Sequence, residues 1–205
     1  MNIKPFSQKS LLIYGIIGAV LFIGIYLVFG FITPGFDVLR DTISSLELVK
    51  NGWVQQINFI AFGIFTLLFT IGLANELVRG INGRLILIFQ SLIAIGLIGD
   101  GIFIHDPMHM ACDLVTFNSV IVVLVLFTRQ FYLSAGWRGW ILYSILSAVL
   151  MMIFLFAFGV ANAHHGLAGL YERLAVLPRT VWSILLIVNL LNGKKLGVVG
   201  ASPAY

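Results

Sequence analysis

Long apolar runs separated by short polar breaks dominate this sequence. A membrane-spanning helix needs about 20 mostly apolar residues to cross roughly 30 Å of hydrocarbon. Lipid leaves no water for unpaired backbone amides, so runs of this length are expected to be helices. The sequence therefore predicts an all-α membrane bundle of six transmembrane helices. The predicted spans are residues 11–32, 54–78, 85–104, 114–128, 139–160 and 175–191.

Composition supports the same class of protein. The 205 residues are 60% hydrophobic and only 10% charged, and the mean hydropathy is +1.06. Such a chain is an integral membrane protein rather than a soluble domain. Six spans with short loops use the whole length, so we expect one domain over residues 1–205. Lys4 and Lys9 precede the first run as in a signal peptide, but the run exceeds the usual ~7–15 residues, and no small-residue cleavage site follows, which predicts a retained helix.

The basic residues predict an orientation. One side of the predicted bundle carries Lys4, Lys9, Arg79, Arg84, Arg129, Arg138, Lys194 and Lys195, and the other carries Arg40, Lys50, Arg173 and Arg179. The excess of Lys and Arg marks the cytoplasmic side, so both termini are expected in the cytoplasm of a multi-pass cell-membrane protein. The net charge of +4 then reflects topology, and no nucleic-acid partner is expected.

Acidic and histidine side chains gather on the opposite, outer side. This arrangement predicts an outward-facing polar site, although acidic loops outside a membrane are in part ordinary. The outer residues are Asp37, Asp41, Glu47, Asp100, Asp106, Asp113 and Glu172, with His105, His109, His164 and His165.

The first outer connection, residues 33–52, is the longest. Apolar residues recur there at helical spacing, which predicts an amphipathic helix over residues 37–50 lying at the interface. Either this helix is a lid over an outer cavity, with Arg40 and Asp41 facing inward, or it floats at the interface with solvated charges. The apolar positions are Leu39, Ile43, Leu46 and Val49, and the polar ones are Arg40, Asp41, Ser44 and Glu47.

The densest polar stretch joins the third and fourth predicted helices. Asp106 followed by Pro107 is typical of a helix start, so the fourth helix is expected to begin there. His109 and Asp113 then lie one turn apart on one face. Asp100 lies inside the third span, where an unpaired carboxylate costs up to ~2.5–3.5 kcal/mol, so it needs a partner such as Arg173.

The last outer connection contains His164 and His165. Adjacent side chains point in different directions, so at most one of these histidines is expected to face the bundle. The guanidinium of Arg173 suits a carboxylate or the phosphate of a lipid. Cys112 is the single cysteine, which excludes an internal disulfide and a multi-cysteine metal site.

Several short motifs resemble one known family. They are Asp41-Thr42-Ile43-Ser44-Ser45-Leu46 before Trp53-Val54-Gln55-Gln56-Ile57-Asn58-Phe59, Gly101-Ile102-Phe103 before Asp106-Pro107, and Gly169-Leu170-Tyr171-Glu172-Arg173. With these motifs the chain resembles, over nearly its whole length, the prokaryotic six-span membrane family catalogued as domain of unknown function 998. The resemblance implies six helices and no established activity. In that family a histidine commonly follows the Asp-Pro turn at a greater distance, whereas His109 comes early.

Three functions follow from these patterns. The leading hypothesis is the binding or transport of a lipid head group or small polar ligand among Arg40, Asp100, His109 and Arg173, with membrane lipid as the expected partner and no cofactor. A purely structural role stays open beside it, and so does the oligomeric state.

The two other hypotheses involve histidine ligands. In a membrane-embedded zinc hydrolase, Asp100, His105, His109 and one of His164 or His165, preferably His165, would bind zinc and activate water. Haem ligation by His109 and His165 is the third hypothesis.

Overall fold

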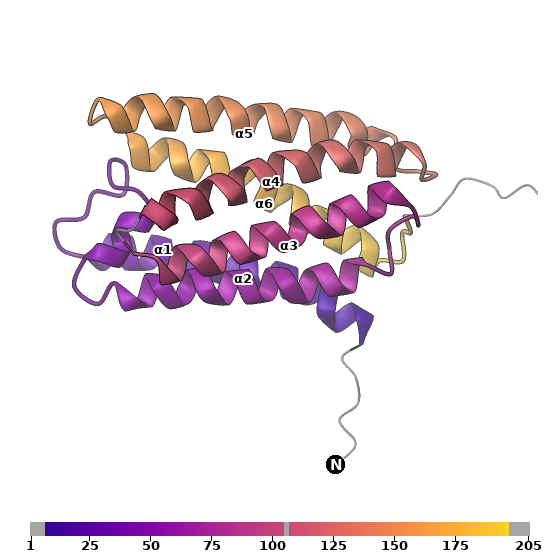
Figure 1. Cartoon of the computed structure of the whole chain (residues 1–205), viewed down its shortest axis with the longest axis horizontal. Coiled ribbons are helices and arrows are strands. Elements are labelled where there is room, and N and C mark those ends of the chain that lie inside the picture. Colours follow the sequence, from indigo (N-terminus) through magenta and orange to yellow (C-terminus); the bar gives the residue numbers. More distant parts are fainter. Residues whose placement is uncertain (1–6, 105–106, 197–205) are drawn as a thin grey trace, which may run out of the picture.

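Six long helices lie side by side and alternate in direction (Figure 1). The computed structural model describes residues 7–104 and 107–196. Every one of the six helices is long and apolar enough to cross a membrane, and no strand occurs in these ranges. The chain is therefore a multi-pass, all-α membrane protein, which confirms the predicted class. The helices are α1 (Gln8–Ile32), α2 (Trp53–Leu73), α3 (Ile81–Ile102), α4 (Pro107–Tyr132), α5 (Gly139–Ala163) and α6 (Ala168–Leu191), with a short 3-10 helix η1 (Ser44–Leu48).

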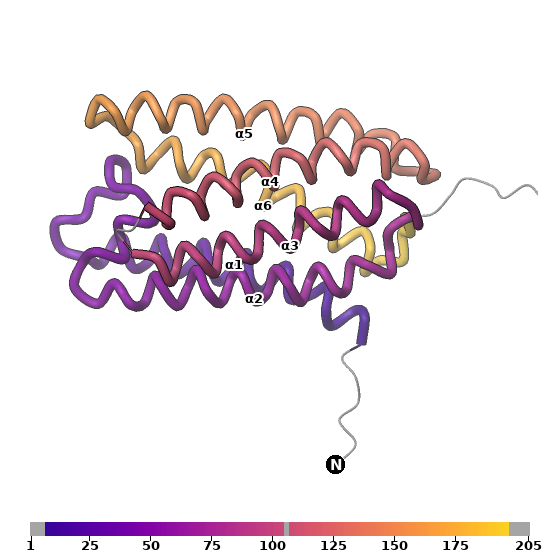
Figure 2. The backbone as a smooth tube through the Cα atoms, in the orientation of Figure 1, coloured from indigo at the N-terminus to yellow at the C-terminus, as the bar shows by residue number. Residues whose placement is uncertain are grey.

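The two ends of the bundle differ in what they carry. The long connection between α1 and α2 lies at one end, together with the α3–α4 and α5–α6 junctions (Figure 2). We call this the loop end. The first residue of α1 and the last residue of α6 lie at the opposite end, which we call the terminal end.

Several helix bounds differ from the predicted spans. α4 begins at Pro107, as the Asp-Pro turn predicted, and α6 begins at Ala168, so both helices extend beyond the apolar runs. Polar side chains in their first turns are shielded by neighbouring elements, and the helix continues through them. α2 ends at Leu73, and α3 starts after Gly80, whose φ of 135° favours glycine.

The first connection forms a shorter helix than residues 37–50 predicted. Only η1 is helical, because side chains compete for the preceding backbone groups. The Asp37 carboxylate accepts from Leu39 N–H at 2.9 Å, and the Asp41 carboxylate accepts from Asp37 N–H at 2.7 Å.

The same connection also pairs with α6. Gly169 N–H donates to the Arg40 carbonyl at 3.1 Å, and Leu170 N–H donates to the Leu39 carbonyl at 2.9 Å. These bonds satisfy amides of the first turn of α6, which have no partner inside the helix. These bonds hold the first connection against the start of α6 at the loop end.

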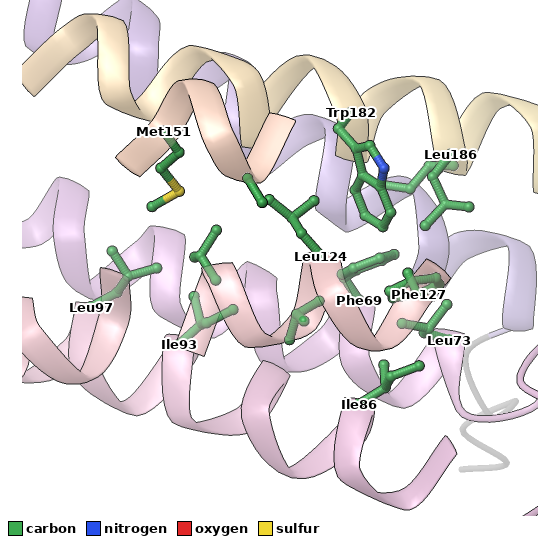
Figure 3. Close-up of a cluster of buried hydrophobic side chains, with 14 of the residues drawn as sticks. Phe69, Leu73, Ile86, Ile93, Leu97, Leu124, Phe127, Met151, Trp182 and Leu186 are labelled. Atoms are coloured by element: carbon green, nitrogen blue, oxygen red, sulfur yellow. The ribbon is translucent and has the colours of Figure 1, made fainter. Parts of the chain in front are cut away.

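Aromatic side chains pack against one another between the helices in the terminal half of the bundle. Trp182 is fully buried, with its ring centroid 4.9 Å from that of Phe127, and its indole N–H donates to Ser144 Oγ at 2.9 Å. Figure 3 shows Trp182, Phe127 and Leu186 converging between the helices. Apolar side chains fill this half, so the buried carboxylates are found toward the loop end.

Candidate metal centre

The α3–α4 junction holds the candidate site. Asp100 lies in the last turn of α3, and Asp113 lies in the second turn of α4. The two helices approach closely because α3 carries glycines at the contact. A Cβ atom on Gly96 would overlap Thr116 of α4, and one on Gly99 would overlap Cys112. Glycine therefore allows the two aspartates to meet.

Asp100, His109 and Asp113 form one cluster, which we call the Asp–His–Asp cluster. One potential ligand atom from each residue lies within 4.8 Å of the others. His109 Nε2 is 3.7 Å from Asp113 Oδ2, and His109 Nδ1 is 3.1 Å from the Asp100 carbonyl oxygen. The predicted one-turn spacing of His109 and Asp113 thus brings their side chains together.

Two buried atoms of this cluster have no hydrogen-bond partner. Asp100 is 1% exposed and its Oδ1 is unpaired, and His109 Nε2 is unpaired as well. A proton on His109 Nδ1 can be donated to the Asp100 carbonyl, which leaves a lone pair on Nε2. Metal-bound histidines commonly hold their second nitrogen in this way. A buried carboxylate without a partner is costly, so the cluster is suited to a cation.

Glu47 of η1 approaches the cluster from the first connection. It is 5% exposed, and its Oε2 lies 3.9 Å from His109 Nδ1. Its Oε1 has no hydrogen-bond partner. Burial, together with the negative charge of Asp113, raises the pKa of Glu47 to about 8. Glu47 is therefore predominantly protonated at neutral pH and adds little negative charge there.

The cluster lies between two cavities. The outer cavity, of about 230 Å³, is lined by Thr42, Ser44, Ser45, Glu47, Leu48, His109 and Met110. The inner cavity, of about 100 Å³, extends between the helices from Asp100, Asp113 and Glu172 to Arg179 and Ile187. An ion can reach the Asp–His–Asp cluster from the outer cavity, past Glu47.

The two arginines predicted for the site have other partners. The side chain of Arg40 is 66% exposed and lies 3.5 Å from Asp37. Arg173 is buried; its Nη1 donates to the Asp41 carbonyl at 2.9 Å and to the Gly169 carbonyl at 2.8 Å. No ion pair joins Arg173 to Asp100 in the described ranges. Arg173 instead holds the first connection against α6.

Glu172 has a similar role beside Arg173. Its carboxylate accepts from the buried Ile43 N–H at 2.6 Å. The two neighbours therefore bind the first connection separately, rather than forming a surface pair with each other.

The remaining histidines lie apart from the cluster. His164 ends α5 and His165 has a left-handed φ of 51°, and both are exposed in the α5–α6 connection. His105 and Asp106 lie outside the described residues. His109 is thus the one histidine found in the cluster among those the structure describes.

Sequence reasoning missed one buried and one half-buried charged residue. Glu47 was placed on the solvated face of a longer helix, and only the fold turns it inward. Arg179 was counted with the outer flank, but it lies half-way along α6 and lines the inner cavity. The sequence did contain a signal for the place of Arg179, because this arginine lies inside the apolar run predicted as the sixth span, residues 175–191.

The fold and the site together define a six-helix, multi-pass membrane protein with a buried Asp–His–Asp cluster at one end of its bundle. The family model "Protein of unknown function (DUF998)" matches residues 16–189, and the chain belongs to this family. The resemblance inferred from the short motifs is thereby confirmed. Searches of the curated proteins and of the solved structures found no match.

Proposed function

We propose that this protein binds a divalent metal ion, with Zn²⁺ as the first choice, through Asp100, His109 and Asp113. The observation that carries the proposal is the convergence of three ligand atoms within 4.8 Å, two of the residues having buried unpaired atoms. Imidazole and carboxylate together suit zinc and other divalent transition metals.

The distances between the candidate ligand atoms are slightly longer than in a zinc-bound site, so these atoms would move closer together when the ion binds. Zinc bound at about 2.1 Å separates tetrahedral ligand atoms by roughly 3.4 Å. His109 Nε2 and Asp113 Oδ2 are already 3.7 Å apart, so small side-chain rotations suffice for this pair. Three protein ligands leave one coordination position open to water or to a substrate.

The site faces outward in this proposal, with both termini in the cytoplasm. The distribution of basic residues supports this orientation. At the terminal end are Lys9, Arg79, Arg84, Arg129, Arg138, Lys194 and Lys195, and at the loop end are Arg40, Lys50 and Arg173.

A cation has more support than a lipid phosphate at this place. Asp100, Asp113 and Glu172 all line the end of the inner cavity that adjoins the cluster, and their charges would repel an anion bound at that end. Arg40, which would have to bind the phosphate, contacts Asp37. Arg173 uses only Nη1, on two backbone carbonyls of the first connection and α6, and its Nε and Nη2 have no hydrogen-bond partner among the described residues.

A metal-dependent hydrolase is a second candidate function. The open coordination position favours it, because zinc lowers the pKa of bound water to about 7. A bound zinc ion would favour the ionised form of the Glu47 carboxyl. In that form Glu47, buried near His109 with Oε1 unpaired, is placed to accept a proton from such a water.

Zinc stoichiometry tests the metal site. Protein purified without chelator, and again after stripping and reloading, is expected to hold one zinc ion per chain by inductively coupled plasma mass spectrometry. His109→Ala and Asp113→Asn should lose it, whereas the exposed control His165→Ala should retain it. Equal zinc in a variant that combines His109→Ala with Asp113→Asn and in wild type would refute the site.

Glu47→Gln separates the two candidate functions. If the site hydrolyses a substrate, this variant keeps its zinc and loses turnover of a test ester presented in micelles. If wild type binds zinc without turning over esters, amides or phosphoesters, the metal-binding proposal is supported and the hydrolase proposal is rejected.

A further inference from the structure

The inner cavity contains a cation whose protein partners are all neutral. Arg179 Nη2 donates to Gln90 Oε1 at 2.7 Å, and Arg179 Nη1 donates to Ser183 Oγ. The guanidinium carbon lies 5.0 Å from the centroid of the Trp182 ring. None of the ion pairs found within residues 7–104 and 107–196 includes Arg179. Its positive charge is not matched by a contacting carboxylate.

Arg179 lies at mid-depth in the bundle. It is half-way along α6, and its partner Gln90 is near the middle of α3. An arginine at the centre of a membrane costs roughly 2.5–3.5 kcal/mol and cannot lose its proton. Glu172 is on the same helix but about 10 Å nearer the loop end, at 1.5 Å per residue. No carboxylate of the described residues forms an ion pair with Arg179, so its guanidinium has no counter-charge in contact with it.

Arg179 has more hydrogen-bond donors than its bonds to Gln90 and Ser183 use. A guanidinium carries five N–H groups, and two of its nitrogens donate to Gln90 and Ser183. The remaining N–H groups form part of a planar fork, which matches the two oxygens of a carboxylate. Gln90 is fully buried, and its own Nε2 also lacks a partner. Arg179 and Gln90 therefore provide hydrogen-bond donors that have no negatively charged acceptor of the described residues in contact with them.

The inner cavity is small, and its walls are mainly apolar except for a few hydroxyl side chains and for the end lined by Asp100, Asp113 and Glu172. Its walls include Phe62, Phe69, Phe117 and Met151. The volume is about 100 Å³, whereas an apolar cavity of roughly 150 Å³ binds benzene. The space beside Arg179 thus suits a chain of only a few carbons. A bare inorganic anion would leave these apolar walls without contacts.

We propose that the inner cavity binds a short-chain carboxylate, with Arg179 on the carboxylate and the aromatic walls around the chain. The ligand supplies the counter-charge that Arg179 lacks. This site does not depend on the metal centre, because Arg179 contacts none of Asp100, His109 and Asp113. The carboxylate can come from water as a free short-chain acid, or from the membrane as the head of a fatty acid whose remaining chain would extend beyond the cavity.

Binding of butanoate to the full-length protein in nanodiscs tests the proposal. Titration calorimetry on metal-stripped and on zinc-loaded protein should give saturable binding in both. Butan-1-ol has the same chain without the charge and should bind at least tenfold more weakly. In Arg179→Met the dissociation constant for butanoate should rise roughly 10- to 100-fold, as expected for lost charge-assisted hydrogen bonds. Arg179→Lys, which keeps the charge, should bind with an intermediate affinity.

The matched control is Arg40→Met, which removes an exposed arginine at the loop end and should leave butanoate binding unchanged. Competition with oleate distinguishes the two sources: displacement of butanoate by oleate indicates a membrane-derived ligand, and its absence indicates a free acid. The proposal is overturned if butanoate and butan-1-ol bind equally, if Arg179→Met binds butanoate like wild type, or if butanoate does not bind at all. Loss of butanoate binding on zinc removal alone would also overturn it, whereas failure of zinc binding leaves it intact.

Discussion

The buried Glu47 carboxyl should make the stability of the metal-free protein depend on pH. Glu47 is 5% exposed at the entrance to the Asp–His–Asp cluster, and burial together with Asp113 raises its pKa from 4.5 to about 8. The perturbation is Glu47→Gln, which keeps the shape of the side chain and removes its titration.

The sign follows from proton binding in the two states. Below pH 4.5 the Glu47 carboxyl is protonated in both the folded and the unfolded chain, so it does not make the free energy of unfolding depend on pH. Between pH 4.5 and about 8 only the folded chain holds the proton, so stability falls as pH rises. Each pH unit in this window costs about 1.4 kcal/mol, and the whole window amounts to on the order of 5 kcal/mol. Above the window the full cost of a buried charge is present.

Unfolding by SDS titration in mixed micelles, with chelator present, measures this effect at intervals from pH 5 to 9. The free energy of unfolding of wild type should fall over the range, and the fall should be smaller in Glu47→Gln by several kcal/mol. The difference between the two proteins isolates Glu47 from other titrating groups. Glu76→Gln, at the terminal end and with an oxygen still able to accept from Gln8, is the control and should follow wild type. Parallel curves for Glu47→Gln and wild type would contradict the burial argument.

Three further outcomes are expected. Gly96→Val should lower the free energy of unfolding by about 1–3 kcal/mol and weaken zinc binding, because its side chain overlaps α4; Gly24→Val, with nothing within 4 Å, should do neither. Arg173→Met should speed amide hydrogen exchange in the first connection, since two carbonyl partners are lost; unchanged exchange would mean that the connection is held by other bonds. In a cysteine-free background, an impermeant maleimide added to intact cells should label His165→Cys but not Arg138→Cys, and the reverse pattern would invert the proposed orientation.

Helix number and type were predictable because they depend on local chemistry. Each of the six helices is long and apolar enough to span a membrane, and the Asp-Pro turn marks the start of α4 at Pro107. The bounds were less predictable where polar residues enter a helix. Ala168–Arg173 looked like a connection, but the backbone of the first connection satisfies the amides of that turn, and the helix begins there.

The candidate site was predictable in part. His109 and Asp113 follow helical spacing, and Asp100 stood out as a carboxylate within a span. Their convergence also needed the glycine contact between α3 and α4. The place of Glu47 was not predictable, because bonds from Asp37 and Asp41 shorten the amphipathic helix and turn that residue inward.

The sequence alone determined that this chain has six helices apolar enough to cross a membrane and that most of its acidic residues lie toward one end of the bundle. Hydrophobicity and helical spacing are properties of neighbouring residues, so they can be read along the chain. Only the tertiary structure decided which polar side chains meet. It brought Asp100, His109 and Asp113 together, directed Arg40 and Arg173 to other partners, and left Arg179 on the inner cavity without a carboxylate of the described residues in contact with it. Such pairings depend on contacts between helices that are distant in sequence, and hydropathy does not encode them.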